Sequence, residues 1–196
     1  MLYSNSPRVH YSKTPLAEVI CQLRFPTILS IGAKEPAEFQ DAIRALFPQY
    51  SVKQERPAPK PVLPGTQPEI PAPITNYPFI SADGKWKLNL TNTFISLSTV
   101  AYPGWEDFAK KLDLPLAALI QVYKPAYFER IGLRYMNFIS RNDLTLGQSP
   151  FSELIQPAYL GILAEDDVQE TAANRCSLEA DIALNGGCRV KIHAGP

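Results

Sequence analysis

The sequence has few of the residues that form metal sites, disulfides or nucleophile–base pairs. Its 196 residues include two histidines, His10 and His193, and neither has a cysteine or carboxylate at the spacing of a zinc site. The cysteines are odd in number and lie within alternating apolar patterns, which favours buried thiols in a reducing compartment over a disulfide. They are Cys21, Cys176 and Cys188. We predict no metal, no cofactor and no assigned catalytic residue.

A net charge and a long apolar run are also absent. The 19 basic and 19 acidic side chains cancel, which removes the overall attraction to a phosphate backbone but still allows a local basic face. No stretch approaches the roughly 20 apolar residues that cross a bilayer, and Met1 does not begin a signal-peptide pattern. We expect a cytoplasmic protein with no membrane partner. No glycine-rich phosphate loop follows a predicted strand, since Asn185-Gly186-Gly187 has the pattern of a hairpin turn.

Periodicity in the apolar residues predicts both strands and helices. Alternation of apolar and polar residues predicts strands over 16–25, 79–82, 86–91, 94–100, 127–139, 176–184 and 188–192. Helical spacing predicts helices over 36–48, over 105–123 with a bend or restart at Pro115, and over 151–160 with an interruption at Pro157. Together these elements predict an α+β fold in which helices pack on one face of an antiparallel sheet.

Two of the strands carry more specific predictions. In the first strand, one face is apolar and should be buried; its members are Ala17, Val19, Cys21, Leu23 and Phe25. The longest strand, 127–139, has apolar groups on both faces, which is typical of a strand in the centre of a sheet.

The segment 57–78 contains eight prolines, a density that excludes helix and removes hydrogen-bond donors from a strand. We interpret it as an extended surface excursion within a single domain, 1–196. A long insertion without secondary structure is one interpretation. The other is a polyproline ligand, for which Pro61-Val62-Leu63-Pro64 has the spacing.

The order of the predicted elements suggests an internal duplication, with halves 11–124 and 125–196. Each half begins with a strand, a helix and an antiparallel hairpin. The second half lacks the long helix that ends the first half, so we expect the natural chain to continue beyond Pro196.

Two segments resemble the signature stretches of a sporadically distributed, uncharacterised prokaryotic protein family of about 250 residues. They are residues 11–19 (YSKTPLAEV) and 129–137 (ERIGLRYMN). The resemblance implies a bacterial, cytoplasmic protein with a further C-terminal segment. It brings no activity and no catalytic residues, and the proline-rich segment departs from the family pattern.

Cationic residues on predicted strand faces form the main candidate binding site. If they share one side of the sheet, they make a basic platform, with Phe128 and Phe138 interleaved, of the kind that binds single-stranded nucleic acid. The candidate contacts are Lys87, Arg130, Arg134, Asn137 and Lys191. The alternative is that these are ordinary solvated side chains. The main functional hypothesis is a noncatalytic binding module.

Two further hypotheses come from different classes. Glu18 and Glu129, at the openings of the two halves, could serve as the paired carboxylates of a hydrolase, or could instead form ion pairs with nearby arginines. Cys188 and His193 fall on opposite faces of one predicted strand, so they do not form a nucleophile and base. A protein-interaction subunit of a bacterial multicomponent system is the third hypothesis, with the proline-rich segment or a sheet edge as its docking surface.

Overall fold

The computed structural model describes residues 13–56, 72–143, 145–147 and 149–195. The chain divides into two compact units, Met1–Phe138 and Ile139–Pro196. Within the described residues, no helix is both long and apolar enough to span a membrane. The fold is α+β with antiparallel strand pairing, as the sequence predicts.

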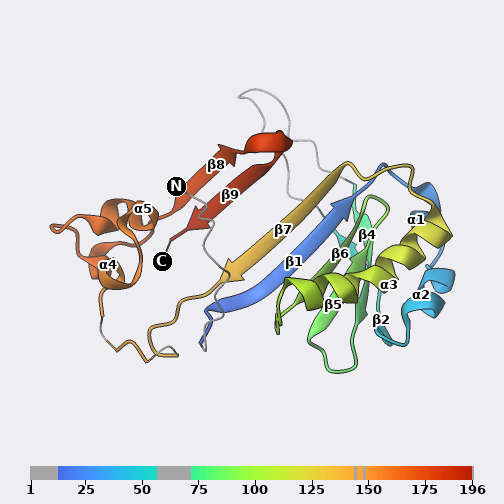
Figure 1. Cartoon of the computed structure of the whole chain (residues 1–196), viewed down its shortest axis with the longest axis horizontal. Helices are drawn as coiled ribbons and strands as arrows, with labels where there is room; N and C mark the ends of the chain where they lie inside the picture. The colour runs from blue at the N-terminus through green and yellow to red at the C-terminus, as the bar shows by residue number, and fades with distance from the viewer. Residues whose placement is uncertain (1–12, 57–71, 144, 148, 196) are drawn as a thin grey trace. The chain divides into compact units, whose positions relative to one another are not determined.

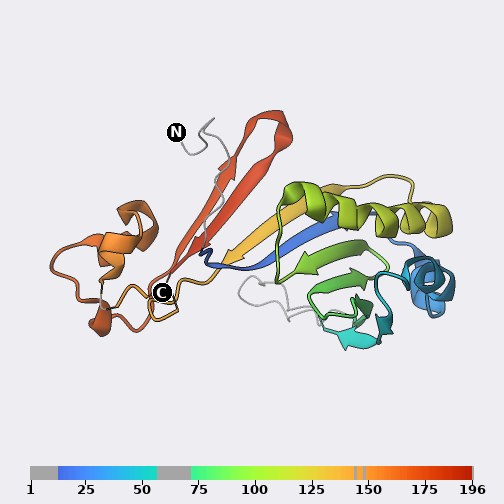
Figure 2. The same cartoon turned by 60° about the horizontal axis from the view of Figure 1, so that its bottom comes forward.

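The first unit is an antiparallel sheet with helices on one face (Figure 1). The strands lie in the order β2-β4-β5-β6-β1-β7, and β3 also pairs with β4. Their bounds are β1 Leu16–Arg24, β2 Gln49–Tyr50, β3 Lys53–Glu55, β4 Ile74–Ile80, β5 Trp86–Leu90, β6 Phe94–Thr99 and β7 Arg130–Asn137. The helices are α1 Leu29–Ala33, α2 Ala37–Ile43 and α3 Trp105–Tyr123. Figure 2 shows α3 lying along one face of the sheet.

The core of the first unit lies between the helices and the sheet. Alternate residues of the central strands point into it, among them Cys21, Leu88 and Leu97, and Phe39, Phe108 and Leu119 meet them from the helices. Aromatic rings pack between the helices and the sheet. The Phe39 ring on α2 makes an edge contact with the Phe79 ring on β4, with centroids 5.6 Å apart. We call the sheet face that points to the helices the proximal face, and the opposite one the distal face.

The sequence predicted most of these elements. It missed helix α1 and strands β2 and β3, and it differed from the structure at Pro115 and at the start of β4. Helix α1 and the short strands β2 and β3 carry too few residues for a periodic signal. Helix α3 is continuous through Pro115, so the alternative of a restart there is wrong; the buried Pro115 packs with the apolar side of the helix, which offsets the missing backbone donor. Strand β4 begins at Ile74, inside the proline-rich segment, and residues 57–71 of that segment lie outside the described residues.

A bulge in β1 overturns one predicted inward residue. The pairing of β1 with β7 shifts between Leu16 and Glu18, so Ala17 is the extra residue and is exposed, while Leu16 packs against the core. From Val19 to Phe25 the predicted alternation is correct, because Val19, Cys21, Leu23 and Phe25 are buried.

Strand β7 is at the edge of the sheet, so the prediction that it is central is wrong. It pairs with β1 on one side, and no described strand pairs with its other side. Every residue of β7 is exposed except Gly132, which is half-buried. This pairing places β7 in the first unit, whereas the predicted repeat divides the chain between residues 124 and 125; the duplication itself stays a prediction.

The second unit contains short helices and a hairpin. The helices are α4 Phe151–Leu154 and α5 Pro157–Leu160, with 3₁₀ segments η1 Gly161–Ala164, η2 Glu170–Ala172 and η3 Asn185–Gly187. The hairpin pairs β8 Leu178–Ala183 with β9 Arg189–Ala194 around the predicted Asn185-Gly186-Gly187 turn. Arg141 contacts two other segments of this unit. Its Nη1 lies 2.9 Å from Glu170 Oε2, and its guanidinium lies over the Phe151 ring.

Candidate ligand-binding face of the sheet

Strand register places the functional candidates of the first unit on definite faces. Residues directly opposite in antiparallel strands point to the same face, and successive residues alternate. Because Val19, Cys21 and Leu23 are buried against the helices, Ile20, Gln22 and Arg24 belong to the distal face. The same pairing carries this assignment to the neighbouring strands.

Three cross-strand rows make up the central part of the distal face. The first row contains Lys87, Ser98, Ile20 and Arg134. The second contains Asn89, Ser96, Gln22 and Gly132. The third contains Phe94, Arg24 and Arg130. Apart from Ile20, Phe94 and Gly132, the residues in these rows are cationic or polar. Ser96 and Ser98 are buried between their neighbours, so the accessible groups are those of the flanking strands, and this face has the composition of a ligand-binding surface and not of a second core.

Three arginines gather on the β1–β7 side of the distal face. Arg24 and Arg130 are directly opposite each other, and Arg134 lies on the same strand and face as Arg130. All three are exposed, and among the described residues no carboxylate forms an ion pair with any of them. Like charges directly opposite in a sheet repel each other at a Cβ separation of about 5 Å. A bound anion would relieve that repulsion.

Gly132 shapes the space between Arg130 and Arg134. It has no side chain, and the Arg130 guanidinium extends over it to donate a hydrogen bond from Nη2 to Gln22 Oε1 at 3.2 Å. A Cβ added to Gly132 would come within 3.9 Å of Arg130 Nη2, which is an ordinary contact. Arg130 is therefore partly oriented by Gln22 before any ligand binds, and orientation in advance reduces the entropy cost of binding.

Amide and hydroxyl side chains form a hydrogen-bonded chain toward β4, in which Asn76 and Ser96 are buried and Asn89 is half-buried. Asn89 donates to Ser96 Oγ at 3.4 Å, and Asn76 Nδ2 donates to Asn89 Oδ1 at 3.2 Å and to Glu55 Oε1 at 2.6 Å. Asn76 Oδ1 is buried and has no hydrogen-bond partner among the described residues. These hydrogen bonds connect Ser96 on β6, through Asn89 and Asn76, to Glu55 on β3.

The structure brings together some of the predicted contacts and not others. Lys87, Arg130 and Arg134 share the distal face; Lys87 and Arg134 end one row, three strand spacings or about 14 Å apart. Asn137 alternates with Arg134 and Met136 and so belongs to the proximal face, opposite Leu16. Phe128 packs its edge against Phe25 in the core, with centroids 6.4 Å apart, and does not join the platform.

Lys191 belongs to the second unit, where its charge is already paired. Its Nζ lies 3.4 Å from Asp181 Oδ2, and Arg189 approaches the same oxygen at 3.3 Å. The basic face predicted for this hairpin is therefore partly neutralised by β8. Sequence reasoning missed Arg24 as a contact, although its position after the buried Leu23 placed it on the solvent side of the first strand.

Glu18 and Glu129 are not brought together. Glu18 lies opposite Met136, whereas the Glu129 amide donates to Arg24 O at 2.8 Å, at the other end of β1. Six residues of strand separate these positions, or about 20 Å, against the roughly 5–10 Å between the paired carboxylates of glycoside hydrolases. The ion pairs found among the described residues involve neither carboxylate.

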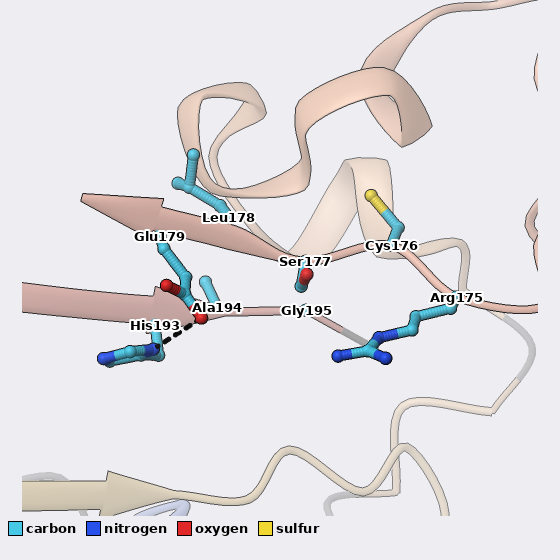
Figure 3. Close-up of a pocket in the computed structure, with 8 residues that line it drawn as sticks. All are labelled: Arg175, Cys176, Ser177, Leu178, Glu179, His193, Ala194 and Gly195. Atoms are coloured by element: carbon cyan, nitrogen blue, oxygen red, sulfur yellow. Dashed lines mark ion pairs between the residues drawn. The ribbon is translucent and has the colours of Figure 1, made fainter. Parts of the chain in front are cut away.

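The second unit has a surface pocket at the open end of its hairpin (Figure 3). Glu179 and His193 point toward each other, with His193 Nδ1 3.5 Å from Glu179 Oε1. Cys176 points away from both, and its thiol donates to Leu160 O at 3.4 Å. Cys188 and His193 alternate on opposite faces of the hairpin, so neither cysteine has the histidine as a base. No group of three or more metal-ligating side chains occurs among the described residues.

Comparison of the chain with models of known protein families, with curated proteins and with solved structures finds no match. The resemblance of residues 11–19 and 129–137 to an uncharacterised prokaryotic family stays a prediction.

Proposed function

We propose that this chain is a noncatalytic binding module that holds single-stranded nucleic acid on the distal face of its sheet. The observation that carries the proposal is the set of three exposed arginines, Arg24, Arg130 and Arg134, two of them directly opposed and none paired with a described carboxylate. Guanidinium groups bind phosphate through paired hydrogen bonds. A phosphodiester backbone supplies several phosphates to such a cluster.

The rest of the distal face fits the same ligand. Phe94 is half-buried in the row of Arg24 and Arg130, next to the charged groups, where a base can stack on its ring. The Gln22 side chain accepts from Arg130 through Oε1 and can donate from Nε2 to a base edge. Lys87 adds a fourth cation at the far end of the first row. A flat sheet face with cations and an aromatic ring is a common architecture for binding single strands.

The local cluster compensates for the absence of a global charge. With 19 basic and 19 acidic residues, long-range attraction to nucleic acid is weak, so affinity depends on the few phosphates that the arginines contact. Binding should therefore be modest and sensitive to salt, with a slope of log K against log salt of about −0.7 for each phosphate contacted on a single strand.

Fluorescence anisotropy with a labelled oligothymidylate of about 12 nucleotides tests the proposal. We expect binding by the full chain at about 50 mM salt, and an affinity about twentyfold weaker near 200 mM if the three arginines each contact one phosphate. Arg24→Ala and Arg134→Ala should each weaken binding about tenfold and lower the salt slope by one phosphate contact.

Lys110→Ala is the matched control, because Lys110 is an exposed cation on α3, on the other side of the sheet. It should leave the affinity within a factor of two. No binding at low salt would refute the proposal. So would an equal loss from Lys110→Ala and Arg134→Ala, since that result indicates diffuse attraction without a site.

A further inference from the structure

The outer edge of β7 is an exposed row of backbone hydrogen-bonding groups. The strand is eight residues long and is last in the sheet order; among the described residues no strand pairs with its outer side. It contains neither proline nor lysine, and its one pairing irregularity lies at its end, next to Asn137. Natural proteins usually protect such an edge with charge, proline, a central bulge or a cover. On β7 the protection is limited to the charges of Arg130 and Arg134, so the edge is suited to pairing with a strand that complements those charges.

The proximal face of β7 carries a row of three apolar side chains that are largely open to solvent, although the Tyr135 ring makes an edge contact with Tyr102. Ile131, Leu133 and Tyr135 are 68 %, 42 % and 46 % exposed, although their partners on β1 are buried in the core. The helices therefore cover the sheet as far as β1 and leave the apolar row of β7 in contact with solvent. A strand added at this edge would bury that row if its own residues on the proximal face were apolar.

The distal face of β7 is cationic. Arg130 and Arg134 are two cations on one face with Gly132 between them, so no side chain separates them. A strand added to β7 places alternate residues opposite these positions. Acidic residues there would pair with the arginines, and the absence of a side chain at Gly132 leaves space for a long one on the added strand.

We propose that the edge of β7 docks an extended segment of a partner protein in which apolar and acidic residues alternate. Backbone hydrogen bonds supply the pairing, the apolar residues cover Ile131, Leu133 and Tyr135, and the acidic residues face Arg130 and Arg134. This is strand addition, in which the edge gives affinity and the alternating side chains give specificity.

A second copy of β7 does not have this complementarity. In an antiparallel self-pairing centred on Arg134, that arginine lies opposite its own equivalent. Centred on Leu133, the pairing places Arg130 diagonal to Arg134 of the other copy. Both registers place arginines of the two copies next to each other across the strand pair, which is unfavourable. Charge therefore selects an acidic partner.

Peptide binding to the full chain tests the proposal. The probe is a fluorescent eight-residue peptide that alternates valine with glutamate, and it should bind in a saturable way. Two control peptides are needed. One has four valines followed by four glutamates and tests the alternating pattern at the same composition. The other alternates valine with lysine and tests the sign of the charge. Both should bind at least tenfold more weakly.

Charge reversal tests whether the acidic residues of the added strand face Arg130 and Arg134. The double variant Arg130→Glu with Arg134→Glu should lose the glutamate peptide and gain the lysine peptide. Both residues are exposed, so the fold should be retained, which circular dichroism can check. Retention of the original preference by the double variant would overturn the proposal, as would failure of the alternating peptide to bind the unaltered chain.

Two more variants separate this edge site from the nucleic-acid site. The pair Ile131→Ser with Leu133→Ser should weaken the glutamate peptide about tenfold and leave oligothymidylate binding unchanged, because both residues lie on the proximal face. Arg24→Ala should weaken the oligonucleotide only, since Arg24 is on β1, one strand in from the edge. A dimer in sedimentation that Ile131→Ser with Leu133→Ser dissociates would instead assign the edge to a second copy.

Discussion

Tyr50 illustrates how burial changes the chemistry of a single side chain. Its ring packs on Phe79 with centroids 5.3 Å apart, and its hydroxyl is buried without a hydrogen-bond partner among the described residues. Burial raises the pKa of Tyr50 to about 12, and the Glu35 carboxylate adds to the effect. Burial raises the pKa of Tyr123 to about 12 as well.

These pKa shifts predict how stability depends on alkaline pH. The unfolded pKa of tyrosine is about 10, and the folded pKa is higher, so the folded state resists ionisation. The stabilising contribution should be complete below pH 10 and should be lost as the pH rises from about 10 to 12. Absorbance at about 295 nm, with urea unfolding at each pH, measures both effects.

Tyr50→Phe should reduce this alkaline decline and, at neutral pH, should leave stability equal or raise it by up to about 1 kcal/mol, because it removes a buried unpaired hydroxyl. Tyr127→Phe is the control, since Tyr127 is exposed and should change neither quantity. A loss of stability in Tyr50→Phe at neutral pH would show that the hydroxyl has a partner in solution.

At the scale of elements, the turn between β4 and β5 shows how local chemistry sets register. Gly84 has φ of +70°, in the left-handed region that side chains disfavour, and its amide donates to Ser81 O at 3.0 Å. Asp83 accepts from the Ser81 hydroxyl at 2.6 Å and from the Lys85 amide at 3.1 Å. The turn thereby positions Lys87 on the distal face.

Two glycine substitutions test this role of backbone conformation. A Cβ added at Gly84 or at Gly32 would meet no atom within 4 Å, so space does not distinguish them. Gly84→Ala should destabilise by about 1–2 kcal/mol because of its positive φ. Gly32→Ala, within α1, should stabilise by about 0.5–1 kcal/mol. Urea unfolding measures both, and equal effects would contradict the assigned turn.

At the scale of the whole molecule, the two units differ in how much core they have. Among the described residues, the buried apolar side chains lie almost entirely in the first unit, and Leu160 and Leu163 are the exceptions. A small core gives low stability. The second unit should therefore lose its structure before the first.

The tryptophans make this prediction measurable. Both of them, Trp86 and Trp105, lie in the first unit, so their fluorescence follows that unit alone, whereas far-ultraviolet circular dichroism follows both. In urea we expect part of the dichroism signal to change at a lower concentration than the fluorescence. Coincident transitions by the two probes would show that the units unfold together.

Local sequence patterns determined most of the elements and the composition of each strand face. Alternation identified the strands that are long enough to repeat it, and Asp83-Gly84 and Asn185-Gly186-Gly187 identified the hairpin turns, because both signals arise between residues that are close in the chain. Alternation offered Lys87, Arg130 and Arg134 as candidates for one face, and the strand pairing puts all three on the distal face.

Tertiary structure alone decided which strands are neighbours. The apolar residues on both faces of β7 are compatible with a central strand or with an edge that binds a partner, and only the pairing with β1 shows the edge. Arg24 and Arg130 are far apart in the sequence, and their meeting depends on that same pairing. Periodicity reports which side of a strand is buried, whereas strand order depends on packing between distant segments, which no local pattern encodes.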